Sequence, residues 1–139
     1  MKNILIINRQ LPSLNDYIHK LNNHYHTGAK FKHEIEDDII RYIWLSRSAK
    51  KLRKVTEYPV EINIEWHEKD EKRDVDNIKS AAKFILDAMQ KAQIIENDGR
   101  KFITQIHDTI VNDKKTFVVV EITTAKKENG ETKWTKLFW

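Results

Sequence analysis

The chain has 139 residues, of which 40% are hydrophobic and 33% are charged. This length suits a single domain with one hydrophobic core, and this composition excludes a disordered chain. Cysteine is absent, which excludes disulfides, thiolate zinc sites and cysteine nucleophiles. No apolar run approaches the roughly 20 residues that span a bilayer, and no signal-peptide pattern is present, so we expect a cytoplasmic protein without a membrane partner. The net charge of +4 permits an anionic partner without requiring one.

The first half of the chain predicts one strand followed by two helices. Residues 2–8 are largely apolar and branched, which is typical of a strand. Ser13 is expected to cap a short helix, because Asp16 follows three residues later and an apolar stripe begins there. The polar stretch 22–28 is expected to end that helix. A longer helix is predicted over 29–46, since apolar residues recur there at every fourth position, and we interpret it as covering a sheet.

The second half predicts strands on either side of a helix. Residues 60–67 alternate apolar and polar side chains, which is the pattern of a half-buried strand. A helical period runs from Asn77, which is expected to start the helix, to Ala92. Two further strands are predicted at 101–107 and 117–123, with a hairpin turn between them.

This order of elements indicates an α+β domain in which helices cover a small mixed sheet. The whole chain, 1–139, is expected to form that single domain. Its tail, about 126–139, ends with three aromatic residues and a leucine within six positions, which favours docking onto an apolar surface.

The stretch from Asp70 to Asp98 carries the residues most suited to chemistry. Asp74 and Asp76 follow the predicted strand, and in an extended chain they point to the same side. Asp98 lies in an Asn-Asp-Gly turn after the predicted helix. If the helix returns the chain to that turn, the three carboxylates surround one point and suit a hard cation such as Mg²⁺. An ordinary acidic turn is the alternative explanation of the same residues.

Basic residues lie before and within this stretch. The run from Arg47 to Lys54 is either a solvated surface or a patch that contacts phosphates. Lys79 and Lys83 are four positions apart in the predicted helix, so they are expected to share a face. Asp87 lies four positions beyond Lys83 and is a candidate ion-pair partner for it.

The acidic and basic residues of this region follow one order along the chain. The order is Asp74-x-Asp76-Asn77, then Lys83-x-x-x-Asp87-Ala88, then Asn97-Asp98-Gly99. It resembles the RusA family of Holliday junction resolvases, in particular the RusA-like proteins of phages and prophages of Gram-positive bacteria. Ser13-Leu14-Asn15 and Gly28-Ala29-Lys30 add to the resemblance, which covers about 11–123.

Two positions depart from the family pattern. Many members have a lysine three residues after the Asn of the motif, where this chain has Ser80. Alignment on Asp87 selects Lys83 as the matching lysine, and Lys79 remains a possible substitute. Asn97 stands where members often have a second acid before the metal-binding one.

The resemblance implies a Mg²⁺-dependent homodimeric endonuclease that cuts two opposed strands of a four-way DNA junction in recombination and repair. It assigns the metal-binding and catalytic carboxylates to Asp74, Asp76 and Asp98, and the essential lysine to Lys83. Mn²⁺ is expected to substitute for Mg²⁺. The expected DNA-binding residues are the nearby basic side chains and those of the basic run, namely Lys72, Arg73, Lys79, Lys50, Lys51, Arg53 and Lys54.

Two other functions remain open from the sequence. The first is a DNA-binding protein of the same fold that recognises branched DNA without cutting it. The second is a structural or interaction protein that carries an acidic turn. A homodimer follows from the resolvase hypothesis alone, because two opposed cuts require two active sites.

Overall fold

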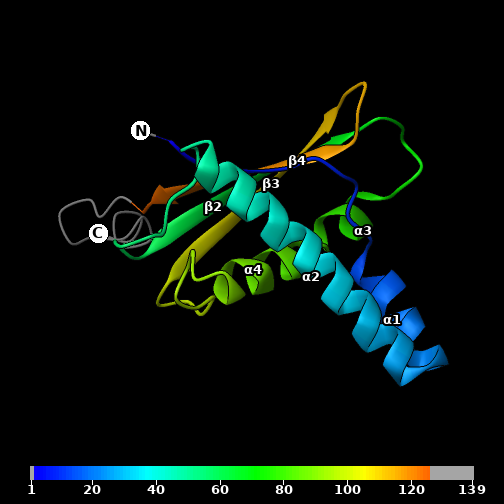
Figure 1. The fold of residues 1–139 in the computed structure, drawn as a ribbon. Coiled ribbons are helices and arrows are strands. Elements are labelled where there is room, and N and C mark those ends of the chain that lie inside the picture. Colours follow the sequence, from blue (N-terminus) through cyan, green and yellow to red (C-terminus); the bar gives the residue numbers. More distant parts are fainter. Residues whose placement is uncertain (1, 126–139) are drawn as a thin grey trace, which may run out of the picture.

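The computed structural model describes residues 2–125, which form two layers: a four-stranded mixed sheet and a layer of helices packed on one of its faces (Figure 1). The elements are, in chain order, β1 (Asn3–Ile7), α1 (Leu14–Asn23), α2 (Tyr25–Ser48), β2 (Val60–Glu68), α3 (Val75–Lys79), α4 (Ala82–Lys91), β3 (Ile103–Asn112) and β4 (Phe117–Thr124). The predicted α+β class, with helices covering a small mixed sheet, is confirmed. The predicted aromatic tail lies outside the described residues.

The sheet has the strand order β1-β4-β2-β3, so β2 lies inside it and β3 lies at one edge. β2 is parallel to β3 and antiparallel to β4, and β4 is also antiparallel to β1. The predicted alternation of β2 is confirmed, because Ile62, Ile64 and Trp66 are buried while Glu61 and Asn63 are only half-buried. The buried row packs with the inner faces of α2 and α4 into one core.

β3 is longer than predicted and is exposed over much of its length. It continues to Asn112, five residues past the predicted end, because it pairs along the whole of β2. From Thr104 to Thr109 its side chains are exposed, on the helix side of the sheet as well as on the open side. Within the described residues, no helix is long and apolar enough to cross a membrane.

The cap of α1 is confirmed, but the loop predicted after that helix is not. The Ser13 hydroxyl accepts from the Asp16 N–H at 3.1 Å, and the Asp16 carboxylate accepts from the Ser13 N–H at 2.9 Å. α2 begins already at Tyr25, so His24 alone separates the two helices. Gly28 lies inside α2, where an added Cβ would lie 2.5 Å from the Leu21 side chain of α1. The glycine permits close packing of the two helices and does not form a turn.

The single helix predicted from 77 to 92 is wrong, because the structure contains two helices there. α3 ends at Lys79 and α4 begins at Ala82. Ser80 lies at the break, where its hydroxyl donates to the Asn77 carbonyl at 2.7 Å and accepts from the Leu14 N–H at 3.0 Å. These bonds tie the break to the beginning of α1. A continuous helical face shared by Lys79 and Lys83 therefore does not exist.

Candidate active site

Asp74 and Asp76 lie at the beginning of α3 and not on an extended strand. β2 already ends at Glu68, Asp74 is the residue that precedes the first helical position of α3, and Asp76 is in its first turn. The predicted arrangement on one side of a strand is therefore wrong. The Asp76 carboxylate accepts from the Asn77 N–H at 3.0 Å. The Asp74 carboxylate is exposed and has no hydrogen-bond or ion-pair partner among residues 2–125.

Lys83, in the first turn of α4, connects two of the acidic residues of the motif. Its ammonium nitrogen lies 3.1 Å from a carboxylate oxygen of Asp87 and 3.8 Å from one of Asp98. The predicted ion pair between Lys83 and Asp87 is confirmed. The hydrogen bond to Asp87 raises the pKa of Lys83 above its usual value, and the nearby Asp98 charge acts in the same direction. Lys83 is therefore a stable cation near neutral pH.

The ion pairs continue from Asp87 across the helix layer into α2. Lys32 of α2 lies 3.6 Å from Asp87 and 3.7 Å from Glu36, and Lys91 of α4 also pairs with Glu36. We call these residues, together with Lys83 and Asp98, the charge ladder. Positive and negative side chains alternate along it.

Glu36 is the buried member of the charge ladder, with 1% of its surface exposed. Neither of its carboxylate oxygens has a hydrogen-bond partner of good geometry among the described residues, so its charge is balanced by the two lysines. A buried carboxylate is strongly destabilising when it is unpaired, which makes these pairs important for how α2 and α4 pack.

The three predicted metal ligands are not gathered at one point. In the part of the chain that the structure describes, no three Asp, Glu or His side chains lie close enough together to hold a metal ion. The topology explains this: Asp74 follows the end of β2, whereas Asp98 precedes Ile103, which pairs with Val60 at the beginning of β2. The ligand chemistry suits Mg²⁺, since all three are carboxylates, but their present arrangement does not.

The beginning of α1 contacts α3 through a side-chain hydrogen bond that the sequence did not predict. The Asn15 amide donates to the Asn77 side-chain oxygen at 2.9 Å, next to the bond between Ser80 and Leu14. The beginning of α1, more than sixty residues earlier in the sequence, thus holds α3 in place. Asn15 and Ser80 are positioning residues for the helix that carries Asp76.

Arg73, predicted to bind DNA, directs its guanidinium group into the protein. It pairs with Glu68, whose carboxylate is buried, and it donates to the Leu11 carbonyl at 2.8 Å. Lys72 and Lys79, which were also predicted to bind DNA, are exposed. Arg73 therefore anchors the loop that leads to Asp74.

The basic run lies at the far end of the sheet from Asp74. The Ile4 N–H donates to the Lys51 carbonyl at 2.8 Å, and Asn3 exchanges hydrogen bonds with the backbone of Arg53. The run is thereby fixed along the edge of β1, beside the beginning of β2. Its predicted members, Lys50, Lys51, Arg53 and Lys54, are exposed there.

Sequence reasoning missed Lys32 and Glu36 as members of the site. Their spacing of four residues in the helix 29–46 is the usual signal for an ion pair. Their burial against α4 depends on tertiary packing, for which the sequence contains no comparable signal.

Neither a scan of protein-family models nor a search of curated proteins found a match to this chain.

Proposed function

We propose that the protein is a Mg²⁺-dependent endonuclease that resolves four-way DNA junctions as a homodimer, with roles in recombination and repair. The contact between Lys83 and Asp98 carries this proposal. Lys83 lies in the first turn of α4 and Asp98 in the turn that follows that helix, and the resemblance assigned both to one catalytic site. Asp87, the third residue of the same motif, completes the contact.

Lys83 has the properties that phosphodiester hydrolysis needs beside the reacting phosphate. It is half-exposed and fully charged near neutral pH, because Asp87 and Asp98 stabilise its ammonium form. A fixed cation of this kind stabilises negative charge that develops on a phosphate oxygen in the transition state. Asp87 acts as the positioning residue that directs Lys83 toward Asp98.

In the proposed site, Asp74, Asp76 and Asp98 hold Mg²⁺, or Mn²⁺ in its place. A divalent ion held by carboxylates supplies an activated water and neutralises charge on the phosphate. Because the three side chains are not gathered in this structure, the proposal requires α3 and the turn at 97–99 to approach each other on binding. The Asp74 carboxylate has no partner among residues 2–125 and is available for such a change.

The dimer belongs to the same proposal. Two opposed cuts in one junction require two active sites related by a two-fold axis, which a homodimer provides. Lys72 and Lys79 are exposed on either side of Asp74 and Asp76, where they would contact flanking phosphates.

The test is cleavage of a labelled synthetic four-way junction beside a linear duplex of the same sequence. We expect paired nicks in the junction with Mg²⁺ or Mn²⁺ and none with a chelator. Asp76→Asn is expected to abolish the nicks. Glu34→Gln, which changes an exposed residue of α2 outside the proposed site, is expected to preserve them. Absence of cleavage by the wild type with either metal, or full activity of Asp76→Asn, contradicts the proposal.

The non-catalytic alternative is favoured by one observation. Among the residues that the structure describes, Asp74, Asp76 and Asp98 do not form a group that could hold a metal ion. A protein of this kind binds branched DNA and leaves it intact. The same assay separates the two functions, because binding to the junction without nicks in either metal supports the alternative.

A further inference from the structure

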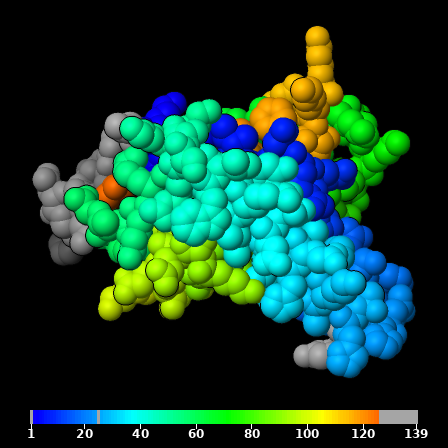
Figure 2. Space-filling view, viewed as in Figure 1, coloured from blue at the N-terminus to red at the C-terminus, as the bar shows by residue number. Residues whose placement is uncertain are grey.

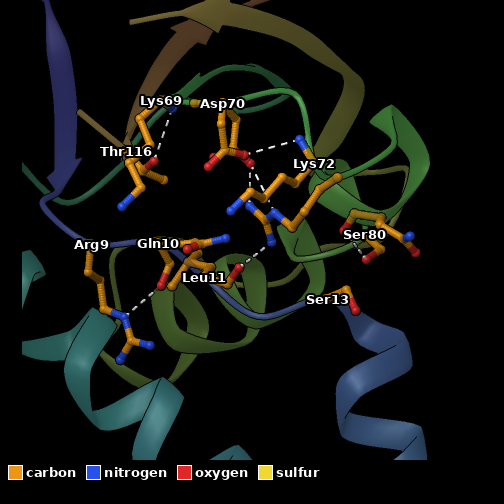
Figure 3. Close-up of polar contacts among 12 residues, drawn as sticks. Arg9, Gln10, Leu11, Ser13, Lys69, Asp70, Lys72, Ser80 and Thr116 are labelled. Carbon is orange, nitrogen blue, oxygen red and sulfur yellow. Dashed lines mark hydrogen bonds and ion pairs between the residues drawn. The ribbon is translucent and has the colours of Figure 1, made fainter. Parts of the chain in front are cut away.

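Two loops meet at the end of β2 that leads to Asp74. The first joins β2 to α3, and the second is the hairpin turn between β3 and β4. The Asp113 N–H donates to the Glu68 carbonyl at 2.9 Å. The Lys69 N–H donates to the Thr116 hydroxyl at 3.2 Å (Figure 3). In the space-filling view the two loops, in orange and green, adjoin at the upper right (Figure 2). They therefore form one continuous surface.

The hairpin turn is held in place by His67 of β2. One ring nitrogen of His67 lies 2.8 Å from an Asp113 carboxylate oxygen, and the ring stacks on Phe117 with 4.1 Å between the centroids. The other ring nitrogen lies 3.0 Å from the Glu65 carboxylate. The position of the turn is therefore fixed by the sheet.

The side chains that this surface offers to solvent include four exposed lysines among exposed carboxylates. The two loops, 69–74 and 113–116, carry five basic and four acidic residues. Two of the four acids contact other groups of the loops and of β2, since Asp70 accepts from the Lys72 N–H at 3.1 Å and Asp113 contacts His67. Glu71 and Asp74 are the remaining acids.

The lysines of the two loops are exposed and have no ion-pair partner within residues 2–125; they are Lys69, Lys72, Lys114 and Lys115. This distinguishes them from Lys32, Lys83 and Lys91 of the charge ladder, each of which contacts a carboxylate. We call the four exposed lysines the two-loop surface. A cluster of unpaired lysines is the usual form of a contact to a phosphate backbone.

We propose that the two-loop surface binds the DNA backbone next to the candidate active site, so that Lys69, Lys114 and Lys115 join Lys72 as phosphate contacts. The inference rests on the proposed function in that DNA is the ligand, but it does not require cleavage. The two-loop surface continues directly into Asp74, whereas the basic run 47–54 lies at the opposite end of β2. We therefore expect the DNA contacts near Asp74 to come mainly from these loops.

The test is binding of a labelled four-way junction in a chelator, which prevents cleavage, over a range of salt concentrations. Lys114→Ala/Lys115→Ala is expected to weaken binding about tenfold at low salt and to reduce the slope of log K against log salt by about two. The matched control is Lys50→Ala/Lys51→Ala, which removes two adjacent lysines from the basic run and is expected to cause a smaller loss. Lys114→Arg/Lys115→Arg is expected to bind as the wild type does.

Equal or greater loss in the control pair overturns the proposal, and so does undiminished binding by Lys114→Ala/Lys115→Ala. Thermal unfolding of each variant confirms that these exposed changes leave the fold intact. If the wild type binds through the two-loop surface but never cuts, the nuclease proposal fails and the two-loop surface stands. If the wild type cuts and Lys114→Ala/Lys115→Ala binds as the wild type does, the nuclease proposal stands and the two-loop surface proposal fails.

Discussion

The ammonium nitrogen of Lys83 lies 3.8 Å from a carboxylate oxygen of Asp98, although Lys83 is at the beginning of α4 and Asp98 follows the end of that helix. This contact connects the beginning of α4 with the segment that precedes β3. It also places Asp98 at one end of the charge ladder, which continues through Asp87 and Lys32 to Glu36, buried between α2 and α4. The candidate active site and the helix packing are thus parts of one network of charges.

Glu36→Gln is expected to lower the free energy of unfolding by about 1 to 3 kcal/mol, because it removes the buried charge that balances Lys32 and Lys91. Urea unfolding measures this change. Glu34→Gln is the matched control, since its exposed pair with Lys30 contributes less than about 1 kcal/mol. Equal effects of the two variants contradict the role of Glu36.

Gly28→Ala is expected to destabilise the protein by about 1 to 3 kcal/mol, because the new Cβ would lie 2.9 Å from the Leu21 backbone. Helix propensity alone predicts the opposite sign, a gain of about 1 kcal/mol. Chemical unfolding decides between them. A stabilised Gly28→Ala variant shows that α1 and α2 are not packed as closely as the structure has them.

The sequence predicted those features that depend on local pattern. The cap at Ser13, the alternation of β2 and the pair between Lys83 and Asp87 all follow from spacing along a single element. The break between α3 and α4 did not follow, because apolar spacing continues across it and only the tertiary bonds of Ser80 define it.

The candidate site shows the same division. Asp87 was predicted beside Lys83 from their spacing, and it is there. Asp98 was assigned to the same site by the family resemblance alone, and it also lies near Lys83. The position of Asp76 was not predicted correctly, since β2 ends eight residues before it and the helix begins at Val75, before the expected start at Asn77. Two acids that are two positions apart point to the same side of a strand but to different sides of a helix. The sequence did not show which of the two structures would form here.

The carboxyl group of Asp113 is expected to titrate below its usual value of 3.8, because the Lys114 N–H and the His67 ring donate to its charged form and lower its pKa. A lowered folded-state pKa means that this contribution to stability is present above about pH 3.8 and is lost as pH falls through the folded-state value. NMR titration of the carboxyl carbon measures it. In His67→Phe the pKa of Asp113 is expected to rise, and an unchanged value contradicts the contact.

Lys83→Met is expected to reduce junction cleavage strongly, because it removes the cation that Asp87 positions beside Asp98. Lys79→Met is expected to cause a smaller loss that appears mainly in junction binding, since Lys79 lies on α3 and is exposed. Separate measurements of binding and of the cleavage rate of bound junction test this difference. A larger rate loss for Lys79→Met assigns the essential role to Lys79.

The most direct test of the central claim is paramagnetic broadening by Mn²⁺ of the NMR signals of the Asp74, Asp76 and Asp98 carboxyl carbons. If these three residues share one cation, their signals broaden together at the same low Mn²⁺ concentration, and Asp74→Asn weakens the broadening at Asp98. If Asp98 is unaffected, or broadens equally in Asp74→Asn, the three carboxylates do not form one metal site.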